Sequence, residues 1–156
     1  MPAANATNAL VNGHIAAAER LIERGGTLTL ATALCLGRWE DVSRLNADAT
    51  EAQRQFAFVL AALNGKAEGL RRMVQSVVNV NASSADLYAH GSPLHHAVCS
   101  GSLEAVQVLV AGADVELQDS AWNGTPLGWA EHYVESAPPE RVAAYRAIAD
   151  YLRKQA

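Results

Sequence analysis

Two adjacent histidines and a nearby cysteine have residue types and a spacing that resemble a metal site. In His95, His96 and Cys99 the cysteine follows the histidines by four and three positions, so on a helix the side chains would share one face. Zinc in a closed site is held by four ligands, and His90 or His132 would have to complete the set. The pattern therefore suggests a metal site that the local sequence does not finish.

Common catalytic motifs are absent from the sequence. There is no G-x-S-x-G, no G-x-x-x-x-G-K-[ST] and no G-x-G-x-x-G, the patterns of a nucleophile elbow and of phosphate-binding loops. Glu135 and Glu140 stand near His132, but a few charges on a helix surface are usually just solvated. We expect no catalysis, no metal and no cofactor. The alternative is a metal- or small-molecule-binding enzyme that uses His96, Cys99, Glu131 and His132.

Composition predicts one folded, helical unit. The chain has 156 residues, of which 50% are hydrophobic and 18% charged, too apolar a mixture for intrinsic disorder. Twelve Lys and Arg against 16 Asp and Glu give a net charge of −4 without a basic cluster, so we expect no nucleic-acid binding. Without a long apolar run or a signal peptide, and with two cysteines far apart, we expect a cytoplasmic protein without a membrane segment.

An alanine followed four residues later by a glycine recurs along the chain. The alanine-to-alanine steps are 24, 28 and 36 residues. Because glycine allows the left-handed backbone that ends a helix, each copy indicates a helix, a tight turn and a second helix. The copies are Ala9–Gly13, Ala33–Gly37, Ala61–Gly65 and Ala97–Gly101.

Small or apolar residues stand mostly at the fifth, eighth and ninth positions after each of these glycines. Steps of three and four place them on one face of the second helix, which favours an all-α fold of packed helix pairs. The residues are Ala18, Leu21 and Ile22; Val42, Leu45 and Asn46; Leu70, Met73 and Val74; and Val106, Leu109 and Val110.

The second half of the chain carries a more specific pattern. Ser92-Pro93-Leu94-His95 and Thr125-Pro126-Leu127-Gly128 lie 33 residues apart, with a glycine-led helix motif at 101–106 and Gly112-Ala113-Asp114-Val115 between them. These segments resemble the T-P-L-H, G-H-L-E-V-V and G-A-D-V-N signatures of ankyrin repeats. Residues 77–81 form a degenerate copy of the last signature. The resemblance is specific over residues 56–133 and faint over residues 1–50.

The resemblance implies an ankyrin-type helical solenoid of about five helix pairs, with one or two short β-turn fingers. We expect residues 1–156 to form a single domain, with divergent helix pairs over 1–50 joined by short connections and clearer repeats over 56–133. Residues 134–142, which contain Pro138 and Pro139, are predicted to be an insertion. A terminal capping helix is expected over 140–154, with an apolar stripe on one face.

Family resemblance also implies structural roles for residues around the T-P-L-H motif. Ser92 and Thr125 would cap the first helices, and His95 would bridge backbone and hydroxyl groups rather than bind a metal. His90 and Asn123 stand where the family has glycine, so both are expected in a left-handed backbone. Gly128 replaces the second T-P-L-H histidine, so one bridge is expected to be missing.

In ankyrin domains partners usually bind the concave face, made of finger tips and first-helix ends. The resemblance therefore implies a non-catalytic scaffold that binds another protein there. Trp122 is either an aromatic anchor for the partner or packs onto the neighbouring finger or Trp129. The predicted partner-binding residues are Tyr88 and Trp122 at finger tips, and Cys99, Ser100, His132 and Tyr133 at helix ends.

Overall fold

The computed structural model describes residues 5–77 and 79–155, and in this part of the chain it has helices and no β-sheet. The helices follow one another as five antiparallel pairs, which confirms the predicted all-α solenoid. The pairs are α1 (Ala6–Val11) with α2 (Ile15–Glu23), α3 (Leu30–Cys35) with α4 (Trp39–Ala47), α5 (Glu51–Leu63) with α6 (Ala67–Met73), α7 (Pro93–Ser100) with α8 (Leu103–Val110), and α9 (Pro126–Ser136) with α10 (Pro139–Arg153).

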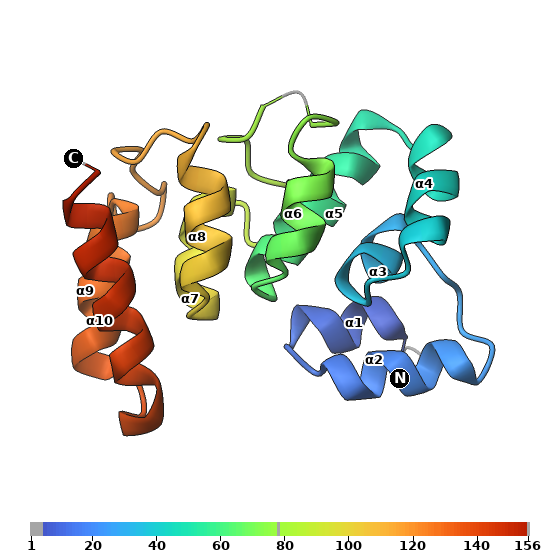
Figure 1. The fold of residues 1–156 in the computed structure, drawn as a ribbon, viewed down its shortest axis with the longest axis horizontal. Coiled ribbons are helices and arrows are strands. Elements are labelled where there is room, and N and C mark those ends of the chain that lie inside the picture. The colour runs from blue at the N-terminus through green and yellow to red at the C-terminus, as the bar shows by residue number, and fades with distance from the viewer. Residues whose placement is uncertain (1–4, 78, 156) are drawn as a thin grey trace.

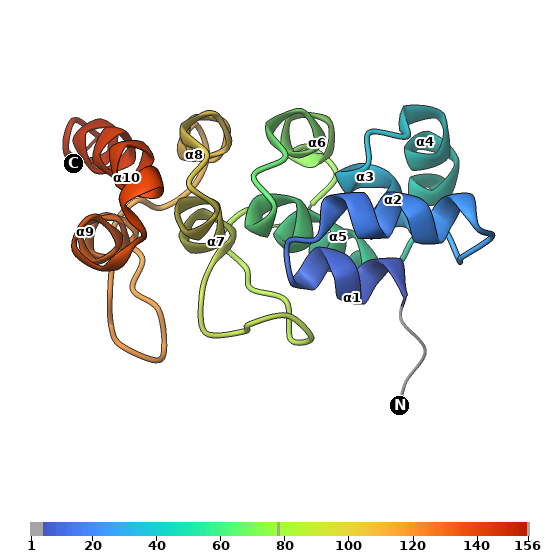
Figure 2. The same cartoon turned by 90° about the horizontal axis from the view of Figure 1, so that it is seen from below.

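The later pairs form two layers. In Figure 1 the helices α5 to α10 stand side by side, and Figure 2 shows α6, α8 and α10 in one layer with α5, α7 and α9 in the other. The first pair, α1 and α2, lies across this stack beside α3 and α5. The stack is an elongated array in which each pair packs against the next one.

Tight turns at glycine join the two helices of the first four pairs. Gly13, Gly37, Gly65 and Gly101 have φ between 65° and 77°, the left-handed backbone that glycine adopts without strain. They are the glycines of the recurring sequence motif, so the predicted helix–turn–helix unit is confirmed at all four copies.

Reciprocal side-chain hydrogen bonds cap the first helix in three of the five pairs and determine where these helices begin. Thr29, Thr50 and Ser92 each accept a hydrogen bond from the backbone N–H three residues later, and that later residue's side chain bonds back. Such reciprocal capping satisfies N–H groups that the helix itself leaves unpaired. Thr125 caps α9 in the same way through its hydroxyl alone, and the predicted capping by Ser92 and Thr125 is confirmed.

One hydrophobic cluster runs the length of the array. It extends from Leu10 in α1 to Leu152 in α10, and its largest members are fully buried. Leu70 and Leu109, from the predicted apolar positions, are among them. In residues 5–77 and 79–155 no helix is long and apolar enough to cross a membrane.

Connections between pairs differ in the two halves of the chain. The segments 24–29 and 48–50 are short, as predicted, whereas 74–92 and 111–125 are long loops. These two loops, here called the first and second fingers, project beyond α7 and α9 in Figure 2. Val78, within the degenerate signature of the first finger, lies outside the described residues.

Residues 134–142, the predicted insertion, lie in the end of α9, the start of α10 and the turn between them. Val134 to Ser136 continue α9, and Pro139 opens α10, one residue earlier than expected. The extra residues thus lengthen two helices, because Pro138 and Pro139 are accommodated at a helix start and not in a helix interior.

The lengthened helices bring three side chains onto the end of α7. Tyr145 donates its hydroxyl to the carbonyl of Cys99 at 2.7 Å, and Arg141 donates to the carbonyl of Ser100 at 3.0 Å. The ring of Tyr133 stacks on that of Tyr145, with centroids 4.8 Å apart. The last carbonyls of α7, which lack helical partners, are therefore satisfied by α10.

The reactivity of the two cysteines provides a test of how α3, α5 and α7 are arranged. Both are free, and α5 lies between the helices α3 and α7 that carry them. Burial raises the pKa of Cys35 to about 12, whereas Cys99 is half-buried at the protein surface. Because the thiolate is the reactive form, we expect a native thiol titration at pH 8 to modify Cys99 first and Cys35 on unfolding.

Unfolded, never-reduced protein should then give two thiols per chain, with Cys99→Ser as the variant that removes the fast phase. Equal native rates at both cysteines, or no free thiol in an intact monomer, would contradict the register of α3 and α7.

Candidate functional site

A groove of about 800 Å³ lies between the fingers and the first helices of the later pairs. The fingers contribute aromatic side chains to one wall, and α7 and α9 contribute the floor, while Val11 and Leu63 close one end from the last residues of α1 and α5. The groove is lined by Val11, Asn12, Leu63, Tyr88, His90, His96, Cys99, Trp122, Gly124, Gly128, Trp129, His132 and Tyr133.

Five of the six residues predicted as partner-binding line this groove. Tyr88, Cys99, Trp122, His132 and Tyr133 come from both fingers, α7 and α9, and the fold gathers them in one place. The sixth residue, Ser100, does not line it. Its hydroxyl donates to the carbonyl of Ala97 at 2.6 Å and accepts from the N–H of Ser102, so Ser100 helps to form the turn after α7.

Trp122 is exposed and also packs against neighbouring rings, so it has features of both interpretations that the sequence left open. Its side chain is 71% exposed, yet its ring meets His90 edge to face at 5.2 Å and Trp129 at 5.9 Å between centroids. Such edge-to-face pairs are favourable. The ring is therefore held by neighbours along one side and offers the remainder of its surface to solvent.

The position of Trp122 depends on a carboxylate that sequence reasoning missed. Asp119, whose side chain is buried, accepts hydrogen bonds from the backbone N–H groups of Ala121 at 2.8 Å, Trp122 at 2.7 Å and Gly124 at 2.8 Å. The indole N–H of Trp129 donates to the same carboxylate at 2.9 Å. Asp119 thus organises the tip of the second finger and attaches it to α9.

The same hydrogen bonds keep Asp119 ionised. Burial alone would raise the pKa of this carboxyl, but donation from Trp122, Trp129, Gly124 and Ala121 favours the charged form and lowers the pKa to about 2. The finger therefore encloses a negative charge at neutral pH.

His95 is the bridge that the family resemblance implied. Its Nδ1 accepts from the backbone N–H of Ser92 at 3.2 Å and lies 2.8 Å from the Ser92 hydroxyl oxygen, so the ring proton belongs on Nε2. Nε2 lies 2.9 Å from the carbonyl of Gly124 and donates to it. Because burial also lowers the pKa of His95, the ring is neutral in the fold and joins α7 to the second finger.

Gly128 occupies the position equivalent to His95 in α9. The His95 bridge reaches Gly124 in the second finger, which follows α8, whereas no finger follows α10 within residues 5–77 and 79–155. Gly128 itself lines the groove.

His96 is a buried structural residue as well. Its Nε2 lies 3.2 Å from the carbonyl of Tyr88, and burial lowers its pKa to about 4. Cys99 accepts a hydrogen bond from the hydroxyl of Tyr133 at 3.3 Å. Among residues 5–77 and 79–155 no three His, Cys, Asp or Glu side chains gather as metal ligands would, so the apparent metal pattern is not completed.

Backbone conformations at the two finger tips differ from each other. Asn123 is left-handed, with φ of 56°, as predicted. In the first finger the left-handed residue is Tyr88, with φ of 44°, so the prediction for His90 was wrong. The finger turns two residues earlier than expected, and this turn directs Tyr88, half exposed, into the groove wall.

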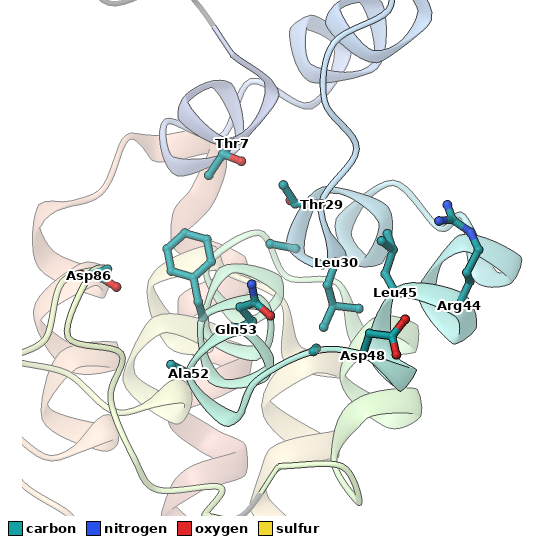
Figure 3. Close-up of a pocket in the computed structure, with 12 residues that line it drawn as sticks. Thr7, Thr29, Leu30, Arg44, Leu45, Asp48, Ala52, Gln53 and Asp86 are labelled. Atoms are coloured by element: carbon teal, nitrogen blue, oxygen red, sulfur yellow. The ribbon is translucent and has the colours of Figure 1, made fainter.

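A second hollow, of about 580 Å³, lies among the helices of the N-terminal half and reaches Asp86 of the first finger. Figure 3 shows Thr7 of α1, Leu30 of α3 and Gln53 of α5 around it, with Arg44 and Asp48 at one side. Its lining contains none of the predicted partner-binding residues. The groove is therefore the stronger candidate site.

Comparison with known families agrees with the geometry. Residues 7–119 match the family model for ankyrin repeats in three copies, so the chain belongs to the ankyrin-repeat family. The match includes the N-terminal half, where the sequence resemblance is faint. A comparison with curated proteins gives no match.

Replacing Asp119 tests the organisation of the second finger. We expect Asp119→Asn to lower the free energy of unfolding by about 2 kcal/mol at pH 7, because an amide cannot accept all four hydrogen bonds as strongly. The contribution of a carboxylate with a lowered pKa is present above pH ~4 and is lost as the pH falls through about 2. Urea unfolding at several pH values measures both effects.

The control is Glu116→Gln, which removes an exposed charge from the same finger and should change stability by less than about 0.5 kcal/mol. A difference between wild type and Asp119→Asn that stays constant down to pH 2 would contradict the role of the ionised carboxylate.

His95→Ala should also destabilise the protein, by about 1 to 3 kcal/mol, because Ser92 and Gly124 lose a buried partner. Since the folded pKa of His95 is lowered, its contribution is complete above pH ~6.5 and declines as the pH falls below that value. Thermal unfolding at pH 7.5 and pH 5 measures this dependence.

His132→Ala is the matched control, because His132 is exposed on α9. A chelator should leave the melting temperature of the wild type unchanged. A fall of several degrees would instead restore the metal interpretation of His96 and Cys99.

Proposed function

We propose that the protein is a non-catalytic scaffold that binds another protein in the groove between the fingers and α7 and α9. The observation that carries the proposal is the exposed Trp122 beside four other residues predicted for this role, Tyr88, Cys99, His132 and Tyr133. Ankyrin repeats are generally protein–protein interaction modules. The family and the groove thus support the same function.

Residue types in the groove favour a protein partner. Tyr88 and Trp122 are the large hydrophobic side chains that are exposed within residues 5–77 and 79–155, and both lie on this one surface. Interfaces are enriched in aromatic residues, and buried tryptophans often contribute most of the binding energy. The net charge of −4 argues against nucleic acid as the partner. We propose a cytoplasmic location, in keeping with two free cysteines.

The enzyme alternative receives no support from the geometry. It requires His96, Cys99, Glu131 and His132 to act together. His96 is bonded to the first finger, and Glu131 forms an ion pair with Arg153 at 3.1 Å, outside the groove. The four side chains therefore do not form one site.

Partner capture from a lysate of the source cells tests the proposal. The bait is the full chain, compared with Trp122→Ala and with Gln107→Ala, which alters an exposed residue of α8 outside the groove. A partner buried against Trp122 should lose about 2 kcal/mol of binding free energy in Trp122→Ala, about 30-fold in affinity, and almost nothing in Gln107→Ala.

Circular dichroism and thermal unfolding must first show that each variant is folded. Equal affinity of all three proteins would place the binding surface elsewhere. Unfolding of Trp122→Ala would show that the packing of Trp122 against His90 and Trp129 stabilises the fold and that Trp122 is not an anchor for a partner.

A further inference from the structure

We propose that the groove accepts an arginine side chain of the partner, with the guanidinium group against the ring faces of Trp122 and Tyr88. The inference rests on the proposed function and specifies the chemistry that would be recognised. Guanidinium groups are planar and weakly hydrated, and they stack on aromatic rings.

Two exposed aromatic rings could contact the guanidinium group. Trp122 is 71% exposed and Tyr88 50%, so both offer ring surface to a ligand. Ring faces carry partial negative charge because of the π electrons. The rings of His90 and Trp129 fill the space behind Trp122, at 5.2 Å and 5.9 Å between centroids, and so hold it in place.

A buried carboxylate provides a negative charge close to these rings. Asp119 lies directly behind this wall and accepts the indole N–H of Trp129 at 2.9 Å. Within residues 5–77 and 79–155, Asp119 forms no ion pair with a lysine or arginine; its partners are backbone and indole N–H groups. Its negative charge is therefore stabilised by N–H dipoles but not paired with a cationic side chain of the described residues, and a cation in the groove would be attracted to it.

No lysine or arginine is among the described lining residues of the groove, so no permanently charged side chain of the lining would repel a cation. His96, whose pKa is about 4, stays neutral at pH 7. Arg141 does not line the groove; it lies at the end of α7, where it donates to the carbonyls of Cys99 and Ser100.

Elsewhere the protein already uses arginine in this way. The guanidinium carbon of Arg72 lies 4.2 Å from the ring centroid of Trp39 on the outer helices. Trp39 thus has an intramolecular arginine, whereas Trp122 has an exposed face and a negative charge nearby. An apolar side chain would also fit among the rings, but it would make no use of the Asp119 charge.

The test compares two probes that differ in charge and hardly in shape, N-acetyl-arginine amide and N-acetyl-citrulline amide. Each is titrated at millimolar concentrations into ¹⁵N-labelled full-length protein at pH 7, and the indole N–H signals of the three tryptophans are followed. We expect the Trp122 signal to shift, with the arginine probe binding about fivefold more tightly than the citrulline probe. Trp39, covered by Arg72, is the internal control and should not move.

Two variants show where the probe binds. Trp122→Leu and Tyr88→Leu keep an apolar side chain but remove a ring, and each should reduce the preference for arginine, whereas Gln107→Ala should keep it. In Trp122→Leu the neighbouring Trp129 signal is followed during the titration, and the Trp39 signal reports the fold.

Equal binding of the two probes would overturn the proposed charge recognition and favour an apolar partner group. Absence of any shift with either probe would overturn it as well. Neither result would alter the outcome of the partner capture, which tests the groove as a protein-binding surface without regard to the partner's charge.

Discussion

The groove depends on how the backbone of Gly124 is held. Its N–H donates to Asp119 Oδ2 at 2.8 Å, and its carbonyl accepts from the ring of His95 and from the N–H of Asp119, both at 2.9 Å. A Cβ atom at this residue would lie 3.0 Å from both the Asp119 carboxylate and the Trp129 ring, closer than ordinary contact. A glycine and a buried charge together thus fix the finger against α7 and α9.

This arrangement extends to the first finger. The N–H of Ser120 donates to the carbonyl of His90 at 2.9 Å, and the N–H of Asp114 donates to the side-chain oxygen of Asn81 at 2.8 Å. The two fingers are therefore connected near their tips and again near the helices. One wall of the groove is built as a unit, so its aromatic rings keep their relative positions without a ligand. Binding to such a preorganised surface costs less conformational entropy.

Much of this fold could be predicted from the sequence because the signals that define it are local. A glycine after the first helix of the first four pairs acts within a few residues, as do Ser92 and Thr125 before α7 and α9, and these signals predicted the positions of those helices. The groove residues followed from the repeat register, since equivalent positions line up in a stacked array. The repeat register also predicted Ser100 at this surface, but Ser100 does not line the groove, and its hydroxyl donates to a carbonyl of its own helix.

Asp119 was missed because its role combines local and distant partners. An Asp that bonds the N–H groups two and three residues later is a recognisable turn former, and this part of its role had a sequence signal. The indole of Trp129, ten residues further on, had none, since a tryptophan in a helix is as readily explained by the core. The turn at Tyr88 was not predicted either, because histidine adopts left-handed backbone more often than tyrosine does, and the sequence therefore favoured His90.

The contacts of Arg141 and Tyr145 with the end of α7 bear on how the array unfolds. In repeat proteins each unit is stabilised chiefly by its contacts with neighbouring units. Here α10 is bonded to the backbone of the preceding pair in addition to its apolar packing. Opening α10 would break these bonds and expose carbonyls of α7, which contributes His96 and Cys99 to the groove. Opening of the α9–α10 pair is thus coupled to opening of the α7–α8 pair, and these two pairs would open as one cooperative unit.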